Sequence, residues 1–315
     1  MSMLVYSVTN EGDLVEEMLR EHGFEVFVGD GNLNYDILEE CDALIPGKAF
    51  VTQEVLAHAP NLKIVSKFGV GVEKIDIDAC TRKGIWVANT PKTNFVSVAE
   101  HTMTLMLNAV KRIYPITLRL RGEESDWKSA KSLLGTELNG RKLLLIGFGN
   151  IGRRVARMAD AFEMQILVFD PYVKADSVPD YVTLVDSIEA GLKEADIVSI
   201  HVAGTADTRH LIGAEQFAIM KSSAIVINTT RGFVVDEVAL IHALEEKEIA
   251  GAALDVFEKE PIRRDNPLLA MENVVVTSHS AGNTVEARIR GQIGVAENII
   301  QCFAGRKPEF ALNTI

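Results

Sequence analysis

Three polar side chains of this 315-residue chain could together carry out a reduction that moves a proton. Arg231, Glu260 and His279 each follow a separate apolar run that is typical of a buried strand. Because the carboxyl ends of parallel strands meet at one edge of a sheet, we expect the three side chains to lie there together. Histidine exchanges protons near neutral pH, a neighbouring carboxylate orients its ring, and arginine can hold a carboxylate or carbonyl oxygen. The set suits proton and hydride transfer at a carbon–oxygen centre.

Each of these residues also has a simpler interpretation when it is taken alone. His279 could be a structural histidine after a strand, and Arg231 could form a surface ion pair. The other histidines, among them His101, are interpreted as surface or structural residues.

Residues 142–170 predict a unit that would hold a dinucleotide cofactor. An apolar run at 143–146 leads into a G-x-G-x-x-G turn, a helical pattern follows, and a second apolar run ends at Asp170. Strand, glycine turn, helix and strand with a terminal acid make a βαβ dinucleotide-binding unit. The alternative is an ordinary glycine turn between a strand and a helix, which the bare motif does not exclude.

Four residues of this unit have separate expected roles toward the cofactor. Gly147 permits the tight turn, Gly149 lets a pyrophosphate approach the backbone, and Gly152 lets the helix pack closely on the strand. The helix N-terminus offers N–H groups to the phosphates. A carboxylate at Asp170 accepts hydrogen bonds from a ribose diol and would repel a 2′-phosphate, so NAD is expected rather than NADP.

The composition is that of an ordinary globular protein, with 47% apolar and 24% charged residues. A formal net charge of -12 argues against a nucleic-acid backbone or an anionic membrane as a partner. The three cysteines are far apart and show neither metal-ligand spacing nor a disulfide framework. We therefore expect no metal site, and a reducing, cytoplasmic location without a leader or a membrane span.

Strands and helices alternate along the whole chain. In the first 90 residues, strands are expected at 4–8, 24–28, 42–45, 62–66 and 85–88. A single long helix is expected at 95–121, and further strands follow from 143–146 to 274–277. A closing helix at 283–304 could return to the first lobe. This alternation predicts parallel α/β sheets in two lobes.

Only the second lobe carries the glycine motif, so the two lobes are expected to differ in function. We predict a two-lobed α/β fold in which a Rossmann NAD-binding domain, residues 94–282, is inserted in a flavodoxin-like substrate domain. The substrate domain would consist of residues 1–93 and 283–315. The long helix has apolar residues on several sides, which favours burial or a contact in a dimer.

Seven stretches of the chain occur in the order that is typical of one known family. These stretches are Phe68-Gly69-Val70-Gly71, Asn89-Thr90-Pro91, Val98-Ala99-Glu100, Gly147 to Gly152, Asn228 to Gly232, Asp255 to Pro261 and Ser278 to Gly282. Over nearly its whole length the sequence resembles the D-isomer-specific 2-hydroxyacid dehydrogenases. Within that family it is most similar to 3-phosphoglycerate dehydrogenases and to glyoxylate or hydroxypyruvate reductases.

The resemblance implies roles in catalysis and in substrate binding. His279 would be the acid/base, Glu260 its partner, and Arg231 the residue that orients the substrate carboxylate and carbonyl. Backbone amides of the loop Gly69-Val70-Gly71 would hold the carboxylate, and its glycines would let the chain approach the ligand closely. An ordinary turn is the alternative for this loop.

The resemblance also implies contacts with the cofactor. Asp255 and the backbone at Thr229 and Thr230 would contact the nicotinamide carboxamide. Asn150 and Ile151 would contact the pyrophosphate through their main-chain N–H groups.

Two departures from the family pattern accompany the resemblance. Ser278 stands before the histidine where proline is frequent, and Ala203-Gly204-Thr205 keeps only the threonine of a Pro-Leu-Thr loop. That loop lies on the adenosine side in the family, so Thr205 is a candidate cofactor contact. The second departure therefore bears on cofactor affinity more than on catalysis.

These observations predict an NAD-dependent oxidoreductase that interconverts a 2-oxo acid and a D-2-hydroxy acid. A 3-phosphoglycerate dehydrogenase is one form of it and a glyoxylate or hydroxypyruvate reductase the alternative, because the sequence does not identify the acid. A non-enzymatic, NADH-sensing protein like the corepressor relatives of this fold is the alternative from another class, since those relatives keep the same three residues. The family resemblance also implies a homodimer.

Overall fold

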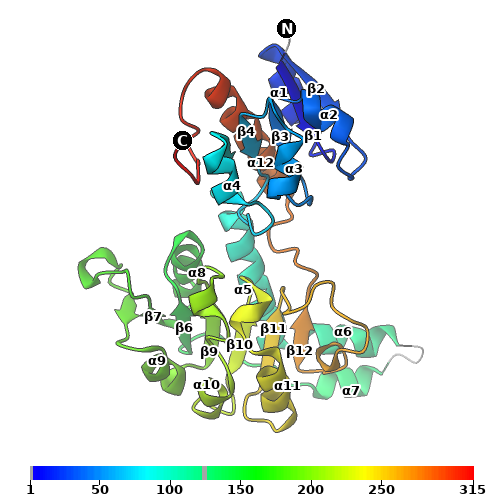
Figure 1. Cartoon of the computed structure of the whole chain (residues 1–315). Coiled ribbons are helices and arrows are strands. Elements are labelled where there is room, and N and C mark those ends of the chain that lie inside the picture. The colour runs from blue at the N-terminus through cyan, green and yellow to red at the C-terminus, as the bar shows by residue number, and fades with distance from the viewer. Residues whose placement is uncertain (1–2, 123–125) are drawn as a thin grey trace. The chain divides into compact units, whose positions relative to one another are not determined.

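The computed structural model describes residues 3–122 and 126–315. The chain divides into two compact units (Figure 1). Unit 1 consists of Met1–Asn94 together with Asn283–Ile315, and unit 2 consists of Phe95–Gly282. The second unit is therefore an insertion in the sequence of the first.

Unit 1 is built on a five-stranded parallel sheet with the strand order β2-β1-β3-β4-β5. Its strands are β1 (Met3–Ser7), β2 (Phe24–Val28), β3 (Ala43–Ile45), β4 (Ile64–Ser66) and β5 (Trp86–Ala88). The register places Val5 opposite Val26 on one side and Ala43 on the other. This strand order is that of flavodoxin, which confirms the predicted fold class of this part of the chain.

Five helices cover the sheet of unit 1. They are α1 (Asp13–Glu21), α2 (Tyr35–Glu40), α3 (Gln53–Ala57), α4 (Ile77–Arg82) and α12 (Val285–Phe303). Helix α12 packs against α1 and β4, and its Ile299 is buried in one core cluster with Val5, Leu19 and Ile64. The closing helix therefore returns to unit 1, as the sequence predicted, whereas α4 was not predicted.

Unit 2 contains a seven-stranded parallel sheet with the strand order β12-β11-β10-β9-β6-β7-β8. Its strands are β6 (Lys142–Ile146), β7 (Gln165–Phe169), β8 (Val182–Leu184), β9 (Ile197–Ile200), β10 (Ile225–Asn228), β11 (Gly251–Leu254) and β12 (Val274–Val276). From β8 inward this is the Rossmann order 3-2-1-4-5-6, extended by one strand. The predicted Rossmann fold is therefore confirmed.

Helices cover both faces of this second sheet. They are α5 (Phe95–Lys111), α6 (Ile113–Arg121), α7 (Trp127–Ser132), α8 (Asn150–Asp160), α9 (Ile188–Glu194), α10 (Ala214–Ala218) and α11 (Glu237–Glu245). Successive residues of β6 enter different core clusters, with Leu144 in one and Leu143 and Leu145 in the other. Burial on both faces explains why the strands read as continuous apolar runs.

The prediction of one long helix at 95–121 was wrong. Helix α5 ends at Lys111 and α6 begins at Ile113, because Arg112 between them adopts the left-handed conformation with φ 55°. The side chain of Asn108 accepts a hydrogen bond from the N–H of Tyr114 at 2.9 Å, which satisfies one donor that the break leaves without a helical partner.

Candidate functional site

His279 lies at the carboxyl edge of the unit 2 sheet, three residues after β12 ends. Its Nδ1 atom is 2.7 Å from Oε2 of Glu260, and the two side chains are 48% and 36% exposed. The second oxygen of Glu260 accepts the N–H of Phe257 at 3.2 Å. A carboxylate fixed in this way holds the proton on Nδ1, so that Nε2 is presented to a ligand.

The backbone at His279 is held in an unusual conformation. Its φ of 55° lies in the left-handed region, which few residues with a side chain adopt. Asp255 holds the turn at three points: its carbonyl accepts the N–H of His279 at 2.7 Å, and its carboxylate accepts those of Ser280 and Ala281 at 2.8 and 2.9 Å. One buried residue therefore determines the direction in which His279 leaves the sheet.

The carboxylate of Asp255 is already engaged by groups of the protein. Burial alone would raise its pKa, but hydrogen bonds from His101, Thr277 and the two turn amides lower the pKa to about 2. Its side chain is only 1% exposed. A carboxylate offers about four acceptor positions, so little capacity remains for the predicted contact with the nicotinamide carboxamide, which stays a prediction.

Arg231 follows β10, the strand next to β11, in a loop that is shaped by Asn228. The amide oxygen of Asn228 accepts the N–H and the hydroxyl of Thr230 at 3.0 and 2.8 Å, and its amide nitrogen donates to the carbonyl of Arg231 at 3.0 Å. The sequence interpretation did not select Asn228. A polar residue at the end of a buried strand was the available signal.

The loops that carry Arg231 and Glu260 lie directly against one another. A Cβ atom added to Gly232 would overlap the backbone of Phe257 and Glu258. The structure therefore brings Glu260 into contact with His279 and packs the loop of Arg231 against the loop of Glu260. All three follow adjacent strands of one sheet edge.

The structure explains why glycine stands at position 204, in the loop Ala203-Gly204-Thr205 that departs from the family pattern Pro-Leu-Thr. A Cβ atom at this position would lie 2.5 Å from Cγ and 3.0 Å from Cβ of Arg231. The glycine thus leaves room for the stem of the arginine. Thr205 is exposed and precedes the short helix Ala206–Thr208, and its predicted contact with the cofactor stays a prediction.

The glycine turn after β6 depends on two of its glycines for internal packing. Gly147 has φ 98°, and an added Cβ would lie 2.7 Å from the carbonyl carbon of His201. A Cβ on Gly152 would overlap the carbonyl of Gly147. At Gly149, directly before α8, an added Cβ would meet no described atom within 4 Å. The backbone is therefore open where the pyrophosphate is expected.

Asp170 stands across this turn, directly after β7. One carboxylate oxygen accepts the N–H of Phe148 at 2.7 Å and the other accepts that of Tyr172 at 2.9 Å. Each oxygen keeps a further acceptor position for a ribose hydroxyl. The open backbone at Gly149 and this oriented carboxylate both fit a dinucleotide.

The remaining predicted cofactor residues lie at the two ends of this arrangement. Asn150 and Ile151 are the first two residues of α8, where the backbone N–H groups lack helical acceptors. Thr229 is buried, and its hydroxyl lies 2.9 Å from that of Thr102 on α5. Contact between Thr229 and a cofactor would therefore be made by its backbone.

In unit 1, the loop Gly69-Val70-Gly71 is held in place by hydrogen bonds with Asn89 and Thr90. Gly69 has φ 92°, and its N–H donates to the hydroxyl of Thr90 at 2.7 Å. The side chain of Asn89 donates to the carbonyl of Val70 at 2.9 Å. Within the described residues, the N–H groups of Val70 and Gly71 have no hydrogen-bond acceptor. They are therefore available to an anion.

Comparison with known proteins places the chain in one family. Residues 103–281 match the model for the D-isomer specific 2-hydroxyacid dehydrogenase, NAD binding domain. The chain is 43% identical over 302 residues to D-3-phosphoglycerate dehydrogenase of Methanocaldococcus jannaschii, covering 94% of this chain and 57% of that protein. The chain belongs to the D-isomer-specific 2-hydroxyacid dehydrogenase family.

Two further proteins show how the chain compares with others. It is 41% identical over 280 residues to glyoxylate reductase of Korarchaeum cryptofilum, covering 88% of this chain and 84% of that protein. Its fold matches the crystal structure of the TT0316 protein from Thermus thermophilus with a TM-score of 0.91 and 33% identity, covering 99% and 100% of the two chains. The chain spans little more than half the length of the D-3-phosphoglycerate dehydrogenases that it matches first.

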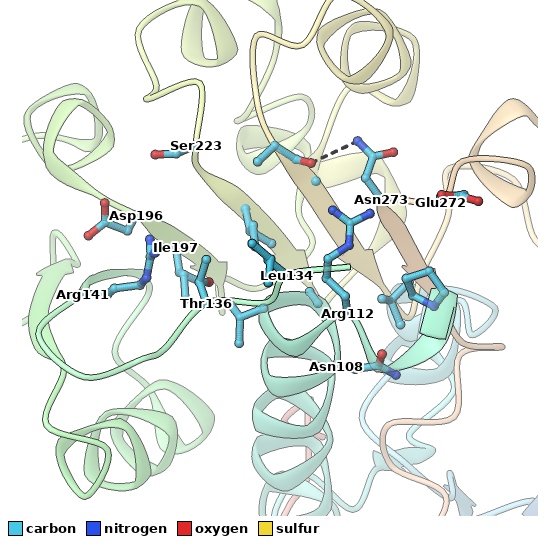
Figure 2. A pocket seen from close by; sticks show the side chains of 17 residues that line it. Asn108, Arg112, Leu134, Thr136, Arg141, Asp196, Ile197, Ser223, Glu272 and Asn273 are labelled. Atoms are coloured by element: carbon cyan, nitrogen blue, oxygen red, sulfur yellow. Dashed lines mark hydrogen bonds between the residues drawn. The ribbon is translucent and has the colours of Figure 1, made fainter. Parts of the chain in front are cut away.

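The chain has a separate cavity of about 200 Å³ at the amino ends of the unit 2 strands (Figure 2). Arg112, Asp196 and Asn273 line it, and Asn273 donates to the carbonyl of Ala250 at 3.1 Å. The residues of the predicted site follow the carboxyl ends of the same strands. The cavity is therefore not the site of His279.

The sequence predicted neither a metal site nor a membrane span, and residues 3–122 and 126–315 of the structure bear on both expectations. No group of three or more His, Cys, Asp and Glu side chains in these ranges is arranged to hold a metal ion. No helix among them has the length and apolar character that crossing a membrane requires.

Proposed function

We propose that this chain is an NAD-dependent oxidoreductase that interconverts a 2-oxo acid and a D-2-hydroxy acid. The contact of 2.7 Å between His279 and Glu260 carries this proposal, because it supplies an oriented proton carrier in a member of this dehydrogenase family. The loop of Arg231 packs against the loop of Glu260, which adds a cation for an anionic substrate.

In the proposed mechanism, the residues of the chain bind the acid and move the proton. His279 donates a proton from Nε2 to the carbonyl oxygen during reduction and takes it back during oxidation. Glu260 keeps Nδ1 protonated and stabilises the charged imidazolium. Arg231 orients the carboxylate and carbonyl, and the N–H groups of Val70 and Gly71 bind the carboxylate. NAD, when bound, supplies or accepts the hydride.

We assign the cofactor to the glycine turn and to the residues around it. Gly147 and Gly152 shape the turn, Gly149 leaves the backbone open, and Asp170, which accepts the N–H of Phe148, keeps acceptor positions for a ribose diol. The other proposed contacts are Asn150, Ile151, Thr205, Thr229, Thr230 and Asp255.

The proposed acid is either a phosphoglycerate-like compound or a smaller 2-oxo acid. Identities of 43% to a D-3-phosphoglycerate dehydrogenase and 41% to a glyoxylate reductase support both. A panel of phosphohydroxypyruvate, hydroxypyruvate and glyoxylate, followed through NADH oxidation, separates them. Selective turnover of phosphohydroxypyruvate would support the first assignment, and selective turnover of the other two would support the second.

The same assay tests the proposed function through two histidine variants. We expect His279→Ala to lower kcat/KM by about 10²- to 10⁴-fold, the range for loss of a general acid. His242→Ala, which changes an exposed histidine on α11, should stay within about twofold of the wild type. Full activity in His279→Ala would refute the proton carrier. NADH binding without turnover of any acid would instead favour an NADH-sensing protein.

We further propose a homodimer that is formed through α6, α7 and the segment after α7. Large apolar side chains gather there with exposures of 50% at Ile113, 51% at Leu118, 69% at Trp127 and 85% at Leu134. Such a gathering is typical of an interface. Sedimentation equilibrium of the wild type and of Leu118→Glu tests this proposal: a monomeric wild type would refute it.

We place the protein in the cytoplasm. The three cysteines are free thiols, and two of them, Cys41 and Cys80, are buried. Unpaired thiols fit a reducing compartment. Fractionation of the source cells, followed with an antibody to the chain, tests this placement.

A further inference from the structure

Helix α5 contributes a second histidine to the support of the proposed catalytic residue. His101 lies on this helix, which packs across β10, β11 and β12. Its Nε2 atom is 3.0 Å from the hydroxyl of Thr277 and 3.5 Å from Oδ1 of Asp255. The imidazole is 21% exposed. It therefore meets the carboxylate that holds the turn of His279, although it does not contact His279.

The hydrogen bonds around Thr277 determine which atom of His101 carries a proton. The hydroxyl of Thr277 lies 2.5 Å from Oδ1 of Asp255. An ionised carboxylate only accepts hydrogen bonds, so Thr277 gives its single proton to Asp255. Thr277 must then accept from His101, which places a proton on Nε2 of that ring.

This arrangement forms a continuous chain of hydrogen bonds from α5 to the turn. His101 donates to Thr277, Thr277 donates to Asp255, and the carboxylate accepts the N–H groups of Ser280 and Ala281. These amides follow His279 directly. The left-handed backbone at His279 persists only where its surroundings hold it. The position of the imidazole therefore depends on the hydrogen bonds that the carboxylate of Asp255 accepts from the turn.

We propose that His101 is a positioning residue for His279, acting through Thr277 and Asp255. It holds the hydroxyl and the carboxylate in the arrangement that orders the turn 279–281. Its effect on turnover rests on the proposed function, whereas its effect on the order of the turn does not. If His101 only filled space between α5 and the sheet, a leucine of similar size would replace it without loss.

Three substitutions separate positioning from packing. His101→Leu keeps the bulk and removes the donor, His101→Gln keeps a donor near the position of Nε2, and Thr277→Val removes the middle of the chain of hydrogen bonds. We expect kcat to fall about 10- to 100-fold in His101→Leu and in Thr277→Val, because small displacements of a reacting group are costly. KM for NADH should stay within about twofold, and His101→Gln should recover kcat to within about threefold of the wild type.

The double variant gives a further test of the pathway. If His101 acts through Thr277, then His101→Leu combined with Thr277→Val should lose no more than about threefold beyond the larger single effect. Multiplication of the two single effects would show that the residues act independently and would overturn the proposed pathway. Should His101→Leu fail to fold, Thr277→Val and His101→Gln carry the comparison.

Hydrogen exchange of the segment 278–282 provides a readout that does not depend on turnover. We expect its amides to exchange at least about tenfold faster in His101→Leu and Thr277→Val than in the wild type, and at the wild-type rate in His101→Gln. Unchanged exchange in His101→Leu would overturn the proposal, as would faster exchange with unchanged kcat. If the wild type turns over no acid, but segment 278–282 exchanges faster in His101→Leu and Thr277→Val as expected, the proposed function alone is refuted.

Discussion

Two carboxylates near one histidine do different work because their surroundings differ. Glu260 is partly exposed and contacts the ring of His279, where it can balance the charge of a protonated imidazole. Asp255 is buried and accepts hydrogen bonds from the backbone of the turn. The first arrangement suits proton transfer and the second suits positioning.

Replacing Glu260 by glutamine should separate charge from shape. Glu260→Gln keeps an acceptor for Nδ1 of His279 but cannot stabilise the imidazolium, so we expect kcat to fall by about 10- to 100-fold. Steady-state rates with the preferred acid measure the effect. Glu258→Gln, in the same loop, removes a carboxylate that pairs with His210 and serves as the control. Equal effects of the two variants would contradict the role of Glu260.

The choice of cofactor is expected to depend on Asp170. Its carboxylate is oriented by the N–H groups of Phe148 and Tyr172. In Asp170→Ala, we expect KM for NADH to rise about tenfold, because the acceptor for the ribose diol is lost. KM for NADPH should change little, because the loss of this acceptor is offset by the loss of repulsion toward the 2′-phosphate. Asp176→Ala, at an exposed site in the same unit, is the matched control. A preference for NADH that survives in Asp170→Ala would contradict the assignment.

At the scale of elements, the site is made by loops that follow adjacent parallel strands. The loop after β9 packs against the side chain of Arg231 at Gly204. The loop after β10 packs against the backbone of the loop after β11 at Gly232. Both contacts require the absence of a Cβ atom. Close packing of loop on loop therefore positions the chain at these two points.

The contact at Gly204 predicts that adding one methyl group there would displace Arg231 and lower activity. Gly204→Ala would place Cβ 2.5 Å from Cγ of Arg231, so the arginine must shift. We expect kcat/KM for the oxo acid to fall about tenfold while KM for NADH changes less. Gly213→Ala is the control, since its Cβ would meet nothing nearer than 3.7 Å. Unchanged kinetics in Gly204→Ala would show that Arg231 tolerates the shift.

At the scale of the whole molecule, one buried ring makes stability depend on pH. Burial lowers the pKa of His201 to about 3, and its Nδ1 atom is buried without a hydrogen-bond partner among the described residues. Below the ordinary histidine pKa near 6.5, the imidazole of His201 binds a proton in the unfolded chain but stays neutral in the folded chain. The free energy of unfolding should therefore decrease as the pH falls from about 6.5 to about 3.

Urea unfolding at pH values of about 8, 6 and 5 measures this dependence. His201 alone contributes a slope of at most about 1.4 kcal/mol per pH unit within that window. His201→Gln has no titrating ring, so its stability should decrease less steeply than that of the wild type. The same slope in His201→Gln and in the wild type would contradict the prediction.

The sequence predicted the elements best where the signal is local. The strand expected at 24–28 matches β2 residue for residue, because its apolar residues and the preceding Gly23 are adjacent in the chain. The helix expected at 95–121 failed at Arg112, where the apolar pattern continues although the backbone turns left-handed. Nothing in the residue type announces that break, since arginine is a good helix former.

The sequence also anticipated a histidine and an acid at one sheet edge, and the structure shows them in contact. It did not anticipate His101, which meets a residue 176 positions away, nor the use of Asp255 as a clamp for a turn. Pairing of buried polar atoms depends on which groups the fold brings within about 3 Å, and no periodicity records that.

The sequence by itself determined the two parallel sheets and the glycine turn, because apolar period, glycine spacing and a strand-terminal acid act between near neighbours in the chain. Only the tertiary structure decided which side chains share a carboxylate, where glycine is needed because another loop packs too closely for a Cβ atom, and where the long helix ends. Those outcomes follow from contacts between distant segments, which exist only after the chain has packed.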